Sequence, residues 1–393
     1  MDSNIGYYYE TNKKLMSLIG QWPYQKPNEK RPRLILLIII ICNALVFQIT
    51  HFFVCEDAQC FYETLAPCML AIVALIKLFT IYFNNHKIKD LTDRLFKNWD
   101  MFTSKEELDI MKKYAETGKW YSLAYVYYVL GGIVIFASTS LLPQMLDVVS
   151  PLNTSRPVML IWPAYYFVDE EKYFYYIYCH MLFCLLYGIN SIVAHDCMLF
   201  VYLEHVCSLF VVIGFRFEHM LYKNNNVKNI RINHPNDMYC KNIMFIVQAH
   251  REALQFVMLL ESTFSLSFGL QMLMVIVGMS ITLVQISIQL QNNLTILIRY
   301  LLLIGGQLFH LFCYSFEGQK LINYSSETGD KIYNGSWYEM PVSAQKLLIM
   351  VMRKSLEASV FTAGKIYIFS LESFTTVLQT SMSYFTVLTS MSE

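Results

Sequence analysis

The chain has 393 residues, of which 55% are hydrophobic and only 15% are charged. Soluble domains carry about a quarter charged residues, so this composition, with a mean hydropathy of +0.38, predicts a membrane protein with several spans. The 30 basic and 30 acidic residues cancel, and this balance suggests no nucleic-acid partner.

Seven apolar stretches are long enough to cross about 30 Å of hydrocarbon. They lie at 34–54, 62–83, 121–142, 173–203, 256–288, 294–316 and 364–391. We therefore expect residues 1–393 to form one all-α polytopic domain with seven transmembrane helices. A further apolar window, Lys346–Lys354, is too short to cross and is expected to be a cytoplasmic amphipathic helix that leads into the seventh span.

The distribution of basic residues predicts the orientation in the membrane. Of the 30 Lys and Arg residues, 26 lie in the amino-terminal segment and after the second, fourth and sixth spans. The opposite side has only Arg156 and Lys172, while Lys77 and Arg299 lie within spans. By the positive-inside rule the amino terminus is cytoplasmic and the carboxyl terminus extracellular. Seven spans also suggest a G-protein-coupled receptor, but that class has its amino terminus outside, so this orientation excludes it.

The long cytoplasmic segments are expected to hold helices that extend past the bilayer. In one of them Leu91, Leu95 and Trp99 recur at helical spacing, which is typical of a helix with one buried face. We expect these helices to form an anchor layer beneath the membrane, with residues 341–391 forming the last anchor helix and the seventh span. The polar stretch Lys223–Asp237 is expected to be a loop.

Two features on the outer side leave alternatives open. Asn153-Thr154-Ser155 has the pattern of a glycosylation acceptor in an outer loop, but such a tripeptide also arises by chance. Cys55 and Cys60 share a short polar segment, where a disulfide would close a very small loop, so bridged and free states both remain open.

The seventh stretch is too polar to face lipid on all sides. The polar residues of one face, wound at about 100° per residue, are Glu372, Thr376, Gln379, Ser383, Thr386 and Ser390. Polar side chains at membrane depth normally face a bundle interior or a water-filled cavity. We therefore interpret this helix as one wall of a pore that Gln379, Ser383 and Ser390 line. Val387 is the candidate gate, because an apolar ring can close a pore by dewetting.

Two acids, Glu261 and Glu372, lie near the cytoplasmic ends of the fifth and seventh spans. Acids at membrane depth favour a cation pathway. The alternative is an acid at the interface that is paired with a neighbour such as Lys365. The sequence does not choose between the two.

Four spans combine apolar side chains with a few polar groups in their outer halves, which is the usual chemistry of a small-molecule pocket. These spans lie at 62–83, 121–142, 173–203 and 294–316. Phe136, Ser140 and Gln144 follow one another at a spacing of four residues, as on one helical face. The candidate ligand-binding residues are Met69, Val73, Phe136, Ser140, Gln144, Tyr175, Tyr178, Met181, Tyr300 and Ile304. Aromatic residues at this depth more often serve packing or an interfacial belt, so that alternative remains.

No arrangement typical of catalysis or metal binding appears. The fourth span and its extension carry His180, His195, Asp196 and His205, but the histidines lack the spacing that places ligands on one helical face. Histidines at helix interfaces or helix ends are the more frequent case. A P-loop and a GxSxG nucleophile pattern are also missing. We therefore expect no enzyme, no catalytic residues, no metal site and no cofactor.

Three carboxyl-terminal segments have a distinctive order of residues. They are HREALQFVMLLESTFSLSFGLQ (His250–Gln271), LFCYSFEGQKLINYSSETGDKIYNGSWYEM (Leu311–Met340) and QKLLIMVMRKSLEASVFTAGKIYIFSLESFTTVLQTSMSYFTVL (from Gln345). In these segments the chain resembles the insect odorant receptor family, whose fifth span, sixth-span region, anchor helix and seventh span they match. Elsewhere the resemblance rests on the topology of the spans and on the loop lengths.

The resemblance implies a subunit of a tetrameric, ligand-gated, non-selective cation channel whose seventh helices surround the pore. It implies a shared co-receptor subunit as partner, a small volatile odorant as ligand, and a location in the lipid of the plasma membrane of sensory-neuron dendrites. It assigns the gate to the valine of the YFxVL segment, Val387, with Ser390 nearby, and the odorant pocket to spans two, three, four and six. The chain is too short for the co-receptor's long cytoplasmic insertion, so it resembles a ligand-tuning subunit.

Three other functions remain as alternatives. The related gustatory receptors share the topology, but their TYhhhhhQF signature is missing from the last span. A transporter could use the polar seventh span as a substrate path, and it would show saturable slow flux instead of single-channel openings. A membrane scaffold without a pore would show no ligand-evoked current.

Overall fold

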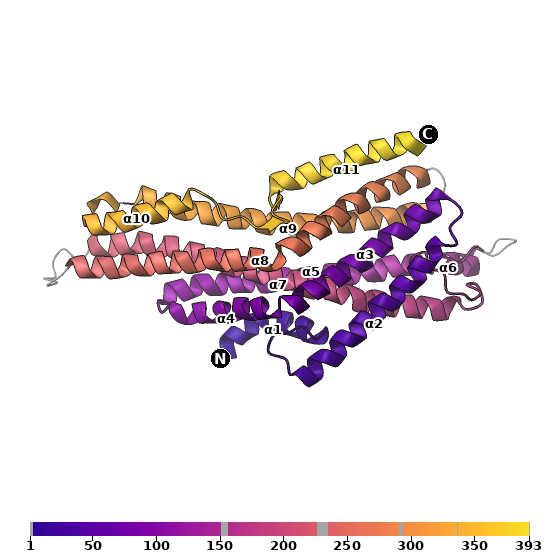
Figure 1. The fold of residues 1–393 in the computed structure, drawn as a ribbon, viewed down its shortest axis with the longest axis horizontal. Helices are drawn as coiled ribbons and strands as arrows, with labels where there is room; N and C mark the ends of the chain where they lie inside the picture. The colour runs from indigo at the N-terminus through magenta and orange to yellow at the C-terminus, as the bar shows by residue number, and fades with distance from the viewer. Residues whose placement is uncertain (1–2, 151–155, 226–234, 291–293, 336, 393) are drawn as a thin grey trace.

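The helices of this protein run roughly along one long axis and form an elongated bundle (Figure 1). The computed structural model describes the chain except residues 1–2, 151–155, 226–234, 291–293, 336 and 393. The described elements are, in chain order, α1 (Ser3–Leu18), α2 (Pro27–Phe52), α3 (Ala58–Phe83), α4 (Asn85–Met101), α5 (Lys105–Thr139), α6 (Leu142–Val149), α7 (Phe174–Asn225), α8 (Pro235–Gln289), α9 (Leu294–Asn334), η1 (Trp337–Glu339), α10 (Val342–Ser355), β1 (Thr362–Ala363), β2 (Tyr367–Ile368) and α11 (Leu371–Ser392).

Six helices among the described residues are long and apolar enough to cross a membrane, namely α2, α3, α5, α7, α8 and α9. Helix α11 packs along α8 and α9. Its 22 residues extend over about 33 Å at 1.5 Å per residue, so it is the seventh span. The prediction of an all-α fold with seven transmembrane helices is confirmed.

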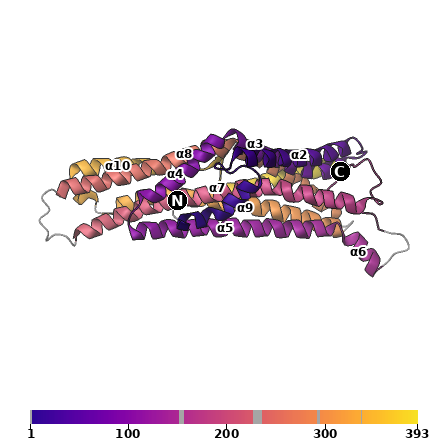
Figure 2. The same ribbon diagram turned by 90° about the horizontal axis from the view of Figure 1, so that it is seen from below.

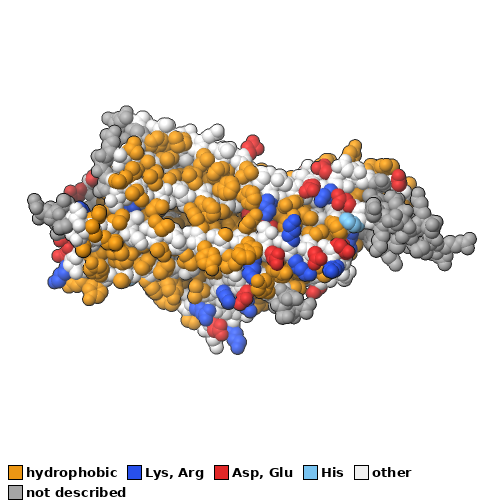
Figure 3. All heavy atoms as spheres, turned by 180° about the vertical axis from the view of Figure 1, so that it is seen from behind, with side chains coloured by type: hydrophobic (Ala, Val, Ile, Leu, Met, Phe, Trp, Pro, Cys, Tyr) orange, Lys and Arg blue, Asp and Glu red, His pale blue; other side chains and the backbone are white. Residues whose placement is uncertain are grey.

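The surface divides into an apolar half and a charged half. Large hydrophobic side chains are exposed along the spans, among them Ile39, Val134 and Leu273. Figure 3 shows the hydrophobic side chains spread over one half and the charged side chains gathered over the other. The carboxyl terminus lies at the far end of the spans and the amino terminus near the middle of the molecule (Figure 1). This division fits the orientation that the basic residues predict.

Helix α7 runs through the middle of the bundle (Figure 2). It packs against α5, α9, α8 and α3, and every residue from 191 to 210 is buried. A helix that is apolar on nearly all sides is stable only when other helices surround it. The fourth span is therefore the core on which the other elements are arranged.

The predicted cytoplasmic helices are present. Leu91, Leu95 and Trp99 of α4 are buried, and the Trp99 indole N–H donates to the Tyr9 hydroxyl at 3.0 Å. Helix α10 covers the predicted short amphipathic helix, and α7, α8 and α9 all extend past their predicted spans. Of the predicted loop Lys223–Asp237, the described ends are helical, and residues 226–234 lie outside the described part of the chain.

The third predicted span ends earlier than its pattern suggests. Helix α5 ends at Thr139, so Ser140 lies in a turn and Gln144 belongs to the separate helix α6. Pro143 explains the break, because it has no N–H for the carbonyl of Thr139 and its ring clashes with that carbonyl. The prediction that Phe136, Ser140 and Gln144 share one continuous helical face is wrong.

The seventh predicted span begins later than expected, at Leu371 instead of Gly364. The residues before it form an antiparallel hairpin of β1 and β2. Gly364 and Lys365 have positive φ angles of 62° and 60°, as the two central residues of a type I′ turn require. The helix then begins after Ser370, whose Oγ accepts the N–H of Ser373 at 3.1 Å as an N-cap does.

Candidate functional site

The outer end of the bundle holds a hydrophobic cluster that is separate from the main core. We call it the outer cluster; its buried members are Ile40, Ala44, Ala137, Ile161, Trp162, Ala164, Ile177, Met181 and Cys184. Phe136 and Tyr178 are partly buried against it. These side chains come from α2, α5, α7 and the segment between α6 and α7, so the cluster forms where three spans meet an outer loop.

The loop segment 156–173 closes the outer cluster from the extracellular side. The N–H of Tyr165 donates to the carbonyl of Phe47 in α2 at 2.9 Å, and the Thr50 hydroxyl donates to the carbonyl of Tyr165 at 3.2 Å. The Phe47 and Tyr166 rings stack with centroids 4.2 Å apart. The segment is therefore fixed to α2 by one backbone hydrogen bond, one side-chain hydrogen bond and ring packing.

Arg299 of α9 holds the same segment from the other side. Its Nη1 donates to the carbonyl of Leu160 at 3.0 Å, and its Nη2 donates to the carbonyl of Ile161. The guanidinium also lies 4.9 Å from the centroid of the Phe136 ring, within the range of a cation–π contact. The sequence alone identifies Arg299 only as a charge within a span. Because a charged side chain at membrane depth is energetically costly, its position there indicates that it has partners.

Three residues near the outer ends of these elements have polar atoms that are buried without a hydrogen-bond partner among the described residues. These atoms are Oγ of Ser140, Nε1 of Trp162, and both side-chain atoms Nε2 and Oε1 of Gln144. Buried polar groups in proteins are nearly always paired, so each such group needs an explanation. A small ligand with one donor and one acceptor would pair with up to two of these atoms. The outer cluster with these polar groups is thus a candidate ligand site.

The structure brings some of the candidate ligand-binding residues together. Met181 is buried in the outer cluster, and Phe136 packs against it. The Tyr178 hydroxyl donates to the carbonyl of Ala137 at 3.4 Å. Ser140 and Gln144 contribute the unpaired polar atoms described above. These five residues remain candidates.

The other candidates lie elsewhere or face away. Val73 of α3 belongs to the main core instead of the outer cluster, and Met69 is buried one turn nearer the outside. Tyr300 and Ile304 of α9 are partly buried. Tyr175 is 67% exposed, because its neighbour Phe174 takes the inward direction and the next residue of a helix points about 100° away. We therefore leave Tyr175 out of the candidate pocket.

Helix α11 turns its polar face away from the rest of the chain. The six polar residues of that face are exposed, namely Glu372, Thr376, Gln379, Ser383, Thr386 and Ser390. The opposite face packs on the bundle, where Val377 and Ser381 are buried and the Ser280 hydroxyl donates to the carbonyl of Ser381 at 3.4 Å. Val387 is 53% exposed. Within the described residues no other element covers the polar face.

The two acids near the cytoplasmic ends of the spans differ in their surroundings. Glu261 accepts a hydrogen bond from the Thr362 hydroxyl at 2.6 Å, so it is satisfied by the hairpin and not by Lys365. The backbone N–H of Lys365 instead donates to the Ser265 hydroxyl at 3.2 Å. Glu372 is exposed in the first turn of α11. Of the two, only Glu372 is free to face a pore.

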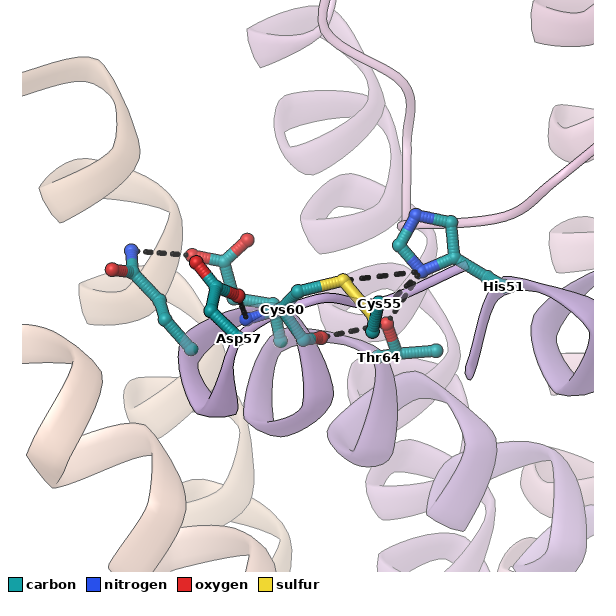
Figure 4. The surroundings of a disulfide bond; sticks show 7 residues. His51, Cys55, Asp57, Cys60 and Thr64 are labelled. Carbon is teal, nitrogen blue, oxygen red and sulfur yellow. Dashed lines mark hydrogen bonds between the residues drawn. A yellow bond between two sulfur atoms is a disulfide. The ribbon is translucent and has the colours of Figure 1, made fainter. Parts of the chain in front are cut away.

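The outer turn between α2 and α3 contains a disulfide between Cys55 and Cys60, with Cα atoms 5.5 Å apart. Figure 4 shows the His51 ring pointing at this bond. Nδ1 of His51 lies 3.6 Å and 3.7 Å from the two sulfurs and 2.9 Å from the Thr64 hydroxyl. His51 and the two cysteines have the donor atoms of a metal site, but bridged sulfurs supply no thiolate. The two cysteines thus serve as a cross-link.

Three histidines of α7 lie apart at contacts with other elements, namely His180, His195 and His205, whereas His219 is exposed. His180 is 2.8 Å from the Tyr166 hydroxyl through Nδ1, and His205 is 3.2 Å from the Asn98 side chain. This arrangement agrees with the interpretation that they serve packing. The candidate glycosylation site at Asn153 lies outside the described residues.

The fold is that of a multi-pass membrane protein with seven membrane-spanning helices. The chain belongs to the insect odorant receptor family: the family model described as 7tm Odorant receptor matches residues 58–382. It is accordingly a receptor and not an enzyme.

Two curated mosquito proteins match parts of the chain. Odorant receptor Or2 of Anopheles gambiae is 30% identical over 92 residues, which are 22% of this chain and 24% of that protein. Odorant receptor 10 of Aedes albopictus is 25% identical over 162 residues, 39% of this chain and 41% of that protein. The matches therefore span less than half the length of these relatives.

Solved structures show the same fold over nearly the whole chain. The insect olfactory receptor OR5 from Machilis hrabei in complex with eugenol has a TM-score of 0.76 and 13% sequence identity, covering 98% of this chain and 97% of that one. A second structure of the same receptor has a TM-score of 0.74 and 12% identity, with 98% of each chain covered. At this identity the likeness establishes the fold alone.

Proposed function

We propose that this chain is the odorant-binding subunit of a ligand-gated, non-selective cation channel in the plasma membrane of olfactory neurons and their dendrites. The observation that carries the proposal is the exposed polar face of α11. The four hydroxyls of this face donate to carbonyls of the same helix. The Gln379 amide and the Glu372 carboxylate cannot rest against hydrocarbon, so this face requires water or other subunits. Several such helices around an axis would enclose a water-filled path that Gln379, Ser383 and Ser390 line and Val387 closes.

One chain supplies only one wall of such a pore. The proposed partner is a co-receptor subunit of the same family, and the proposed assembly is a tetramer with the α11 helices at its centre. The apolar surface of the spans (Figure 3) supports the proposal that the rest of the transmembrane surface contacts lipid.

The proposed ligand is a small volatile molecule that binds at the outer cluster. An apolar body would gain free energy from the cluster's hydrophobic side chains, and one polar group would pair with Ser140, Gln144 or Trp162. The complex of the Machilis hrabei receptor with eugenol supports a ligand of this size. The ligand favours opening only by its greater affinity for the open conformation.

Patch-clamp recording from cells that express the chain, with and without a co-receptor, tests the channel function. An odorant panel should evoke single-channel openings with a linear current–voltage relation. Saturable slow flux without openings would favour the transporter alternative, and the absence of any ligand-evoked current would favour a scaffold. The gustatory-type alternative predicts responses to non-volatile tastants in place of odorants.

Ser140→Ala tests the ligand site. Loss of one ligand hydrogen bond, worth about 1 kcal/mol, should raise the half-maximal odorant concentration about fivefold without changing the current in the absence of odorant. Ser138→Ala is the control, because Ser138 is exposed and its hydroxyl donates to the carbonyl of Val134. Equal odorant sensitivity of both variants would argue against the site.

A further inference from the structure

A buried network of charged and polar side chains lies deep within the bundle, away from the outer cluster. Lys77 of α3 and Asp196 of α7 form an ion pair, with 1% and 0% of their side chains exposed. The Tyr125 hydroxyl of α5 donates to Oδ2 of Asp196 at 2.9 Å. Nζ of Lys77 also donates to the Tyr314 hydroxyl of α9 at 2.9 Å. Four spans therefore meet at one ion pair.

The network continues through His310 of α9. With Tyr125 donating to Asp196, the Tyr125 oxygen accepts from Nδ1–H of His310 at 2.6 Å. The other ring nitrogen, Nε2, then accepts from Nε2 of Gln271 in α8 at 2.6 Å. This assignment of the tautomer follows from the donors available. A fifth span is thereby joined to the same ion pair.

The network lies at the level where α11 begins. Asp196 is about 30 Å below the outer end of α7, counted at 1.5 Å per residue, and so near the cytoplasmic side of the spans. Ionisable residues at such depth are costly and are functional candidates by default. Neither the outer cluster nor the polar face of α11 includes Lys77 or Asp196.

Aromatic rings connect the ion pair to the start of α11. Nζ of Lys77 lies 5.3 Å from the Phe268 ring centroid and 5.4 Å from that of Tyr314. The Phe369 ring packs on both of these rings, at 5.6 Å from Phe268 and 5.7 Å from Tyr314. Phe369 directly precedes Ser370, the N-cap of α11. A displacement of Tyr314 or Phe268 therefore changes the surface on which the first residues of α11 are seated.

We propose that the Lys77–Asp196 network is the positioning element that couples the ligand-bearing spans to α11 and holds α11 in its resting conformation. The inference rests on the proposed channel function. Lys77 orients Tyr314 through the phenolic oxygen, and Tyr314 with Phe268 seats Phe369. A ligand that shifts α5, α7 or α9 changes these contacts and releases α11.

Tyr314→Phe is the sharpest test, because it keeps the ring that packs on Phe369 and removes only the oxygen that Lys77 holds. Tyr202→Phe is the matched control: Tyr202 is also fully buried, and its hydroxyl bonds to Thr92 at 2.8 Å, away from the hairpin. We expect Tyr314→Phe to raise the current without odorant, relative to the maximal evoked current, at least fivefold at equal surface expression. Tyr202→Phe should leave this ratio unchanged.

A purely structural role would lower surface expression and both currents in proportion, which leaves the ratio as in the unmodified chain. An unchanged ratio for Tyr314→Phe in a conducting channel would overturn the coupling role and leave the channel function standing. The absence of any current from the unmodified chain with a co-receptor would overturn both.

Lys77→Met and Asp196→Asn provide a second test, which remains interpretable even if the single variants fold poorly. Each single variant leaves one buried charge or polar group without its partner and should lower surface expression. The double variant removes both charges, so expression should recover while the raised ratio of basal to evoked current remains. Recovery of the unmodified ratio together with expression would overturn the proposal.

Discussion

Gly318 of α9 packs against the backbone of Phe369, just before α11 begins. A Cβ atom at this position would lie 2.2 Å from the carbonyl oxygen of Phe369, whereas a Cβ at Gly132 would meet nothing within 4 Å. The backbone oxygen cannot move without shifting the hairpin. The absent side chain at Gly318 is therefore what allows the close approach.

Gly318→Ala should destabilise the protein by about 1–3 kcal/mol, the usual cost of overpacking a core. The midpoint of thermal unfolding of the detergent-solubilised receptor measures this effect. Gly132→Ala is the control and should leave the midpoint unchanged or slightly higher, since Ala favours a helix over Gly. Equal midpoints for the two variants would contradict the contact.

Val387 is the proposed constriction of the pore, and a substitution at this residue tests that role. Val387→Ala removes apolar volume from the proposed constriction and should raise the current in the absence of odorant. Val134→Ala is a suitable control, since Val134 of α5 is 63% exposed, similar to Val387. An unaltered basal current from a well-expressed Val387→Ala channel would count against the gate.

At the scale of single residues, sequence reasoning found the polar face of α11 but not the partners of the buried charges. Lys77 and Arg299 stood out as charges within spans, which implies partners. The partners themselves, Asp196 and the carbonyls of Leu160 and Ile161, lie more than a hundred residues away along the chain. No spacing rule relates positions on different helices, so only the packing of the bundle identifies such pairs.

Among the elements, the disulfide turn between α2 and α3 is a cross-link of short range. It joins residues five positions apart, for which chain entropy gives a stabilisation of about 2 kcal/mol. Cys55→Ser with Cys60→Ser should lower the thermal unfolding midpoint by about 2–3 °C, and a thiol reductant should do the same to the unmodified protein only. Insensitivity to the reductant would show that the bond is absent in the membrane.

The elements that the sequence predicts best are those with many periodic apolar residues. All seven spans have helices, and α4 and α10 follow their predicted amphipathic patterns. The hairpin before α11 was missed because two-residue strands have no periodicity to detect. Its signals were local: Gly364 in a tight turn and Ser370 three residues before Ser373, which is the spacing of an N-cap.

For the whole molecule, the exposed face of α11 predicts an assembly with this helix near its centre. A cysteine at Ser383 should form a disulfide with a cysteine at the same place in a second subunit when oxidant is added, as a dimer band without reductant would record. Val134→Cys, on the exposed surface of α5, has the same native cysteines and serves as control. Cross-linking of the control to the same extent would indicate random collision instead of assembly.

The exposed polar face of α11 also matters for a chain that has just been inserted into the membrane. A newly inserted chain that has not met its partners presents six polar side chains of α11 to lipid or to whatever shields them. In the proposed assembly this face would be covered, so it gives the machinery that retains or degrades orphan membrane proteins a feature to detect. If the proposed assembly forms, the amount of receptor that reaches the cell surface depends on the supply of partner subunits as well as on the rate at which this chain is made.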